Sequence, residues 1–187
     1  MTNIRIRLLL FATLLAIPIS ARADVVTDWN NAALNSIRAG RTSPPVASRT
    51  LAVLPASIYD AVNGIDRSHE AYLVKGSVPA SISKEAAVSA AARTVLLALY
   101  PTNAPMYDSL HASTLAEIPD GPRKNKAIAW GESVARQILA VRANDGASVA
   151  ASVPYTPGSI LGDWQPTPPA LAPALLPGWG QVTPFGL

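Results

Sequence analysis

Cysteine is absent from the 187-residue sequence, so the fold has no disulfide bond, no thiolate nucleophile and no metal site built on thiolates. Charged residues are also scarce, at 14 %, against roughly 25 % in an average soluble domain. A chain with so little charge tends to leave apolar side chains on its surface, and such surfaces commonly meet a partner. Hydrophobic residues make up 49 %, which is enough for one core in a chain of this length.

Motifs of several common enzyme classes are missing as well. The sequence has no Gly-x-Ser-x-Gly, no phosphate-binding P-loop and no dinucleotide fingerprint, and it has no His-Glu-x-x-His or Glu-x-x-His pattern for zinc or di-iron. Ser81-Ile82-Ser83-Lys84 matches the Ser-x-x-Lys pattern of serine acyl-enzymes, but the Ser-Asp-Asn and Lys-Thr-Gly segments that accompany it are absent. We therefore interpret these serines as helix caps.

The first 23 residues have the pattern of a secretory signal peptide. Two arginines precede an apolar run at positions 8–19, and Ala21-Arg22-Ala23 supplies the small-x-small cleavage site. The run is shorter than the roughly 20 apolar residues that span a membrane. We predict cleavage before Asp24, export to the periplasm or the medium, and no stable membrane span after cleavage.

Removal of this segment changes the charge balance. The full chain has 15 basic and 12 acidic residues, and three of the arginines lie within residues 1–23, so 12 basic residues face 12 acidic ones in the mature chain. The sequence pI of 9.4 thus reflects the signal peptide. No basic patch with interleaved aromatic residues remains, and we exclude nucleic acid as a partner.

Apolar residues spaced three to four apart predict five helices in residues 24–150, which we take as one helical domain. The predicted segments are about 25–38, 44–64, 84–100, 104–118 and 122–144. Pro55 should kink the second, and the third is apolar on several sides, so we expect it to be the central buried helix. No run alternates as a β-strand does. The predicted fold class is all-α, a bundle of about five helices with an extended proline-rich C-terminal strap.

Local signals also predict the ends of these helices. Ser83, Asn103 and Asp120 are suited to cap the third, fourth and fifth helices, and Asp145-Gly146 is suited to end the fifth.

The strap covers residues 151–187. Eight of the 34 residues from Pro154 to Leu187 are proline, which excludes an ordinary helix or an inner strand. The segment also contains Trp164, Trp179 and Phe185, which disordered linkers tend to lack. We predict a strap that packs on a surface.

Few residues are candidates for chemistry. His69 and His111 are the two histidines, and Asp108 lies one turn before His111, where a carboxylate can orient an imidazole. A polar helix face explains the same pair without chemistry, and we favour that interpretation. Four arginines surround the first two helices and could converge on an oxyanion, although solvation of helix ends explains them more simply: Arg38, Arg41, Arg49 and Arg67. No catalytic, cofactor-binding or metal residue is assigned.

Three sets of residues nevertheless resemble a known family. Val26-Thr27-Asp28-Trp29-Asn30, Ser43 to Arg49 and Ile58 to Asn63 resemble the N-terminal helices of bacterial vanadium-dependent haloperoxidase-like proteins, in the superfamily of type 2 phosphatidic acid phosphatases. Pro177 to Phe185 looks like the strap that precedes their catalytic half. The resemblance covers nearly all of the mature chain.

The resemblance implies an α-helical bundle that holds vanadate, for halide oxidation by peroxide, or a phosphate, for hydrolysis. The family uses a Lys, an Arg-Pro pair, a Pro-Ser-Gly-His segment and a later Ser-Arg segment with a His, because a charged oxyanion needs several cations and donors. This sequence has no Arg-Pro and no Pro-Ser-Gly-His, and its Ser48-Arg49 belongs to the second predicted helix.

We therefore expect the N-terminal helical half of a vanadium haloperoxidase-like or acid phosphatase-like protein, truncated or split from its catalytic half and inactive alone. Vanadate is implied for the complete family member, and no cofactor is expected in this chain. Its expected partner is the missing half or a second copy. The alternatives are an exported helical binding module that holds a partner with its Pro/Trp-rich tail, and a remnant without activity.

Overall fold

The computed structural model describes residues 24–150 and 152–186, and the predicted signal peptide lies outside these ranges. Within them the chain is all-helical, without β-strands, which confirms the predicted fold class. Each of the five long helices begins at the predicted residue or its immediate neighbour. The elements are α2 (Val25–Ala39), α3 (Pro44–Asp66), α4 (Lys84–Leu99), η2 (Pro101–Asn103), α5 (Ala104–Ala116), α6 (Pro122–Arg142), α7 (Ala147–Ala150) and η3 (Pro177–Gln181).

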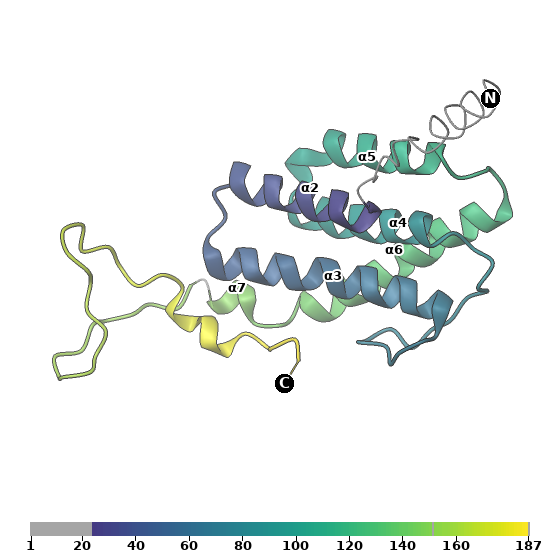
Figure 1. The fold of residues 1–187 in the computed structure, drawn as a ribbon. Helices are drawn as coiled ribbons and strands as arrows, with labels where there is room; N and C mark the ends of the chain where they lie inside the picture. The colour runs from purple at the N-terminus through teal and green to yellow at the C-terminus, as the bar shows by residue number, and fades with distance from the viewer. Residues whose placement is uncertain (1–23, 151, 187) are drawn as a thin grey trace, which may run out of the picture.

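Helix α4 occupies the centre of the bundle, as predicted (Figure 1). It contacts α2, α3, α5 and α6, and its many alanines let these helices approach closely. Helix α6 contributes Gly131 to its contact with α4. A Cβ added at Gly131 would lie 2.2 Å from the carbonyl oxygen of Ala87 on α4. The backbones of α4 and α6 therefore touch, and no larger side chain fits between them.

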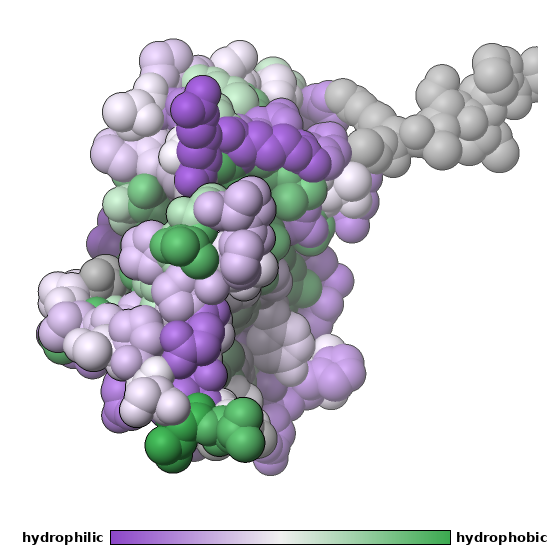
Figure 2. All heavy atoms as spheres, turned by 90° about the vertical axis from the view of Figure 1, so that its left-hand side faces the viewer, coloured by the Kyte–Doolittle hydropathy of each residue, from purple (hydrophilic) through white to green (hydrophobic). Residues whose placement is uncertain are grey.

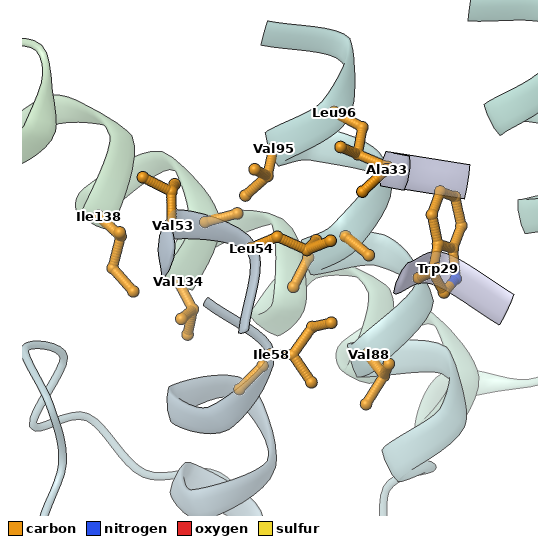
Figure 3. Packing of buried hydrophobic residues seen from close by; sticks show 14 of the residues in the cluster. Trp29, Ala33, Val53, Leu54, Ile58, Val88, Val95, Leu96, Val134 and Ile138 are labelled. Atoms are coloured by element: carbon orange, nitrogen blue, oxygen red, sulfur yellow. The ribbon is translucent and has the colours of Figure 1, made fainter. Parts of the chain in front are cut away.

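The core is built from large side chains around α4. Trp29 of α2, Leu54 of α3, Leu96 of α4 and Ile138 of α6 are fully buried, and Figure 3 shows them converging with valines from the same helices. Two other leucines of α4, at positions 97 and 99, only pack against the edge of this core. Helix α5 adds a single buried residue, Tyr107, whose hydroxyl bonds to the buried Ser36.

Two of the three predicted N-caps occupy the cap position. The Ser83 hydroxyl accepts a hydrogen bond from the Ala86 N–H at 3.1 Å, so the capping interpretation of this serine is confirmed. Asn103 precedes α5 but makes no side-chain capping bond.

Helix α6 begins at Pro122 as predicted, but the predicted cap of this helix is wrong. Gly121 takes the N-cap position, with φ of 145°, and Asp120 instead accepts a hydrogen bond from Lys124 Nζ at 2.8 Å. That hydrogen bond, with the ammonium charge, holds the pKa of Asp120 below its usual value. The other end also differs, because α6 ends at Arg142 and Asp145 caps α7 through the Ala147 N–H.

Helix α3 runs without interruption through Pro55, which lies on its exposed side. Within the described ranges, no helix combines the length and hydropathy needed to cross a membrane.

The tail divides into two parts. Residues 152–176 extend away from the bundle as an irregular loop, and η3 then returns to pack on α7 (Figure 1). The prediction that the whole strap packs on a surface is thus wrong for residues 152–176, where Ile160 is 72 % exposed and Trp164 is 42 % exposed. We call residues 152–176 the arm.

Candidate functional site

The imidazole of His111 links two helices. Its Nδ1 lies 2.9 Å from the hydroxyl of Ser89, which is fully buried on α4. The orienting role considered for Asp108 is not formed, because Arg93 takes that carboxylate, with Nη2 2.6 Å from Oδ1. Burial first, and the Arg93 charge second, lower the pKa of His111. A neutral imidazole hydrogen-bonded to a buried serine is well suited to join α4 and α5 and poorly suited to hold an oxyanion.

The four arginines singled out in the sequence do not converge. Arg38 lies in the last turn of α2 and donates to Asn35, which fits the helix-end interpretation. Arg67 follows α3 and donates to the Val78 carbonyl. Arg49 departs from that interpretation, since it forms an ion pair with the buried Asp145 across 96 positions of sequence. Arg41 is exposed after α2.

A buried arginine that the sequence did not single out holds the returning tail. Arg142, 5 % exposed, donates from Nη1 to the Thr183 carbonyl at 2.8 Å and from Nη2 to the Pro184 carbonyl at 3.2 Å. Its guanidinium lies 3.5 Å from the centroid of the Phe185 ring, and Nη2 also bonds to the Tyr72 hydroxyl. These contacts occupy the charged end of the side chain with groups of the protein itself.

Asp145 completes this cluster. Its carboxylate lies 2.7 Å from Arg49 Nε, and its carbonyl accepts from the Thr183 N–H at 2.8 Å. Arg49 also donates from Nη2 to the Arg142 carbonyl at 2.6 Å. We call Arg49, Arg142 and Asp145 the tail clamp. Its function is structural, because each charge is paired or hydrogen-bonded within the chain.

The connection between α3 and α4 has no regular structure, but side chains of α3 anchor it as the tail clamp anchors the tail. The carboxylate of Asp60, fully buried on α3, accepts from the backbone N–H groups of residues 72, 73 and 74 at 2.7–2.9 Å. Asn63 makes two hydrogen bonds to the backbone of His69, of 2.8 and 3.0 Å. The ring of Trp130 fills the space against Gly64 and Gly76, where an added Cβ would lie within 3 Å of it.

A cavity of about 610 Å³ opens beside this connection. Its lining includes three residues whose side chains can carry positive charge, Arg67, His69 and Lys75, together with Glu70 and Tyr72. The sequence placed His69 in a long linker and gave no sign that it would line a cavity together with two cations. The hydrogen bonds of Asp60 and Asn63 bring these residues to one place.

Two other cavities differ in character. One of about 470 Å³ lies between the starts of α2 and α4 and the end of α5, and its charged lining residues are all acidic: Asp24, Asp28, Glu85 and Glu117. Another, of about 530 Å³, lies within the arm and is lined by Tyr155, Trp164 and prolines. Among the described residues no group of three or more His, Asp or Glu side chains could hold a metal ion.

This chain is similar to a known protein in structure but not detectably in sequence. No protein-family model matches this sequence, and no characterised protein matches it closely enough to indicate kinship. Among solved structures, the crystal structure of a bacterial vanadium-dependent iodoperoxidase, described as the first, matches with a TM-score of 0.71 and 23 % sequence identity. The match covers 91 % of this chain and 44 % of the iodoperoxidase chain. This chain therefore has a haloperoxidase-like all-α fold and spans less than half the length of the iodoperoxidase that it resembles.

Proposed function

We propose that the chain is the N-terminal helical half of a vanadium haloperoxidase-like or acid phosphatase-like protein, and that it supports a catalytic half which binds vanadate or phosphate. The observation that carries the proposal is the asymmetry of the structural match, 91 % of this chain against 44 % of the iodoperoxidase. The segments that resemble the family occur in order from Val26 onwards, which supports the assignment to the N-terminal half.

The roles of the charged residues support a scaffold. A catalytic oxyanion centre needs several cations and a histidine directed at one point in a site that excludes water. Arg67, His69 and Lys75 line one cavity but are exposed, so they do not meet this requirement. In the described ranges Arg49 and Arg142 are used by the tail clamp, and His111 is bonded to Ser89. We propose that vanadate or phosphate chemistry requires residues supplied by the catalytic half.

The arm supports a docking role toward that half. It contains one charged residue, Asp163, whose carboxylate accepts from the Ile160 N–H. Its large apolar side chains are exposed, including Leu161 and Leu171. Figure 2, which views the molecule from the arm side, shows green apolar residues standing out among polar ones. Apolar side chains exposed in this way gain free energy when another surface covers them.

A direct test is to assay the chain from Asp24 onwards with orthovanadate, peroxide and iodide or bromide, and separately with a phosphate ester. We expect neither halide oxidation nor hydrolysis, and the iodoperoxidase serves as the positive control. Sustained vanadate-dependent oxidation by this chain alone, abolished by His111→Ala, would overturn the proposal. The DNA downstream of the codon for Leu187 gives a second test, because a continuation that encodes Pro-Ser-Gly-His is expected.

The exposed arm also favours the second candidate, an exported binding module that holds a partner with its Pro/Trp-rich tail. The two candidates differ in the sequence expected downstream of Leu187. Unrelated DNA there, together with a partner that is lost on deletion of residues 152–176, would favour the binding module.

We propose export for either candidate. Asp24, the first residue after the predicted cleavage site, is the N-cap of α2, and its side chain accepts from the Val26 N–H. Cleavage there would leave the cap and the helix intact. Mass spectrometry of periplasmic or secreted protein should find an N-terminus at Asp24, and a membrane-bound chain that retains Met1 would contradict the proposal.

A further inference from the structure

The connection between α3 and α4 is anchored more strongly than a simple linker requires. Asp60 and Asn63 together make five hydrogen bonds to its backbone, and the Val78 N–H donates to the Gly64 carbonyl at 3.0 Å. A buried carboxylate that accepts three backbone N–H groups fixes the course of the chain. Irregular segments that are held in one shape by a rigid scaffold commonly carry binding residues.

The side chains that line the 610 Å³ cavity include two cations, Arg67 and Lys75, and one carboxylate, Glu70. The Lys75 ammonium has no hydrogen-bond or ion-pair partner within residues 24–150 and 152–186. Arg67 uses Nη2 for the Val78 carbonyl at 3.1 Å, which orients the guanidinium and leaves its other N–H groups for a ligand. Ser68 engages Nδ1 of His69 at 2.8 Å, so Nε2 remains for an additional contact.

We propose that this cavity binds a small oxyanion of the phosphate class, with Lys75 and Arg67 as the charged donors and His69 as a third polar contact. A guanidinium presents paired donors to two phosphate oxygens, and an ammonium adds a point charge. The cavity is larger than one phosphate group and therefore also has room for the organic part of a phosphate monoester.

Glu70 lies in the same lining and opposes such a ligand. The Tyr59 hydroxyl donates to the Glu70 carbonyl at 2.7 Å, which fixes the backbone of this residue while its carboxylate stays exposed. The two cations outnumber this one carboxylate, so the lining attracts anions. Because Lys75, Arg67 and His69 are exposed to water, which weakens charge interactions, we expect binding at this site to be reversible. The site is built only from residues of this chain, so the proposal does not rest on the proposed function.

The test is a titration of the chain with inorganic phosphate at constant ionic strength, followed by the NMR shifts of the backbone amides of residues 67–77 and of the His69 ring. We expect saturable shifts confined to this segment. Lys75→Gln should weaken binding about tenfold, the effect of losing one charge-assisted contact. Its control is Lys126→Gln, which removes the same charge from an exposed site on α6 and should leave the affinity unchanged.

A second variant makes the result specific to charge within the cavity. Glu70→Gln removes the opposing carboxylate and should strengthen phosphate binding. Unchanged thermal unfolding of both Lys75→Gln and Glu70→Gln shows that the fold is intact, which the exposure of both side chains leads us to expect. Phenyl phosphate and vesicles that contain phosphatidic acid then distinguish a free phosphate ester from a lipid headgroup, and binding of either supports the proposal. Shifts that do not saturate, or equal weakening by Lys75→Gln and Lys126→Gln, would overturn it.

Discussion

The helical bundle and the arm are both rich in apolar residues, yet one is buried and the other is exposed. In the bundle, helix α4 buries most of its alanines, valines and leucines against its neighbours. In the arm, Ile160 and Leu161 are largely in water. The difference lies in the backbone. A helix satisfies its own N–H and C=O groups and can therefore enter a core. Six prolines between residues 152 and 176 prevent the arm from forming a helix or an inner β-strand.

The arm leaves and rejoins the bundle at one place, where η3 packs on α7; we call this place the base of the arm. At this base the α-carbon of Gly178 lies so close to Val153 and to the Ala150 carbonyl that an added Cβ would meet the valine at 2.5 Å. The tail clamp then fixes the residues that come after η3. The arm is thus a projection with both ends fixed, and its own contacts, such as the edge-to-face pair of Tyr155 and Trp164 at 5.5 Å, are local.

The largest expected contrast between the two regions is in stability. Leu96→Ala, at a fully buried position on α4, should lower the free energy of unfolding by about 2–5 kcal/mol, because it removes buried methyl groups and leaves a cavity. Leu161→Ala, the matched control in the arm, should change it by less than about 0.5 kcal/mol. Urea unfolding followed by circular dichroism measures both. Equal losses would mean that the arm is part of the core.

The next effect concerns the clamp that connects the regions. Arg142→Gln should cost about 2–3 kcal/mol, because charged hydrogen bonds to the carbonyls of residues 183 and 184 are lost inside the protein. Hydrogen exchange should rise in residues 183–185. Arg136→Gln breaks an exposed ion pair with Glu132 on the same helix and serves as the control, with an expected cost below about 1 kcal/mol. Unchanged exchange in Arg142→Gln would show that other contacts hold the tail.

The closeness of α4 and α6 gives a smaller effect. Gly131→Ala should destabilise the protein by about 1–3 kcal/mol, since the new methyl group meets the Ala87 backbone and the helices must separate. Gly180→Ala adds the same methyl group in the tail, where nothing lies within 4 Å, and should be close to neutral. Thermal unfolding distinguishes the two variants. A neutral Gly131→Ala would mean that the contact between these helices is loose.

The smallest expected effect is a pH dependence confined to the bundle. Burial and Arg93 lower the pKa of His111, although Glu132 and Asp108 raise it and Lys124 lowers it further. The unfolded chain then binds a proton more tightly than the folded one, so stability is fully present above the unfolded pKa of about 6.5 and is lost as the pH falls below it. Unfolding at pH 8 and pH 5 should show this loss, and His111→Gln should reduce it. His69→Gln, at an exposed position, should not; an equal reduction in both variants would refute the assignment.

The fold was predictable because its signals are local. Helix starts follow from apolar periodicity and from residues such as Ser83, and the central place of α4 follows from its apolar character on several sides. Local signals identified the cap of α4 but not that of α6. Asp120 fits the pattern of an N-cap equally well, but Gly121 holds that position and the Asp120 carboxylate accepts from Lys124 in the first turn of α6.

The candidate sites were much less predictable. The sequence paired His111 with its helical neighbour Asp108, but the structure gives each a partner on α4, Ser89 and Arg93 respectively. Local spacing shows which side chains share a helix face and does not show which helix packs against that face. The cavity beside Arg67 and Lys75 had no sequence signature, because hydrogen bonds from Asp60 and Asn63 create its shape.

The sequence by itself determined the all-α class, the positions of the five long helices and the exclusion of disulfides, because each depends on residue type or on spacing within a few turns. Tertiary structure decided the rest. It joined Arg49 to Asp145 and Arg142 to the tail across more than 40 positions, and it left the arm in solvent although its composition is apolar. Such contacts depend on how helices dock in three dimensions, and no periodicity along a chain encodes that docking.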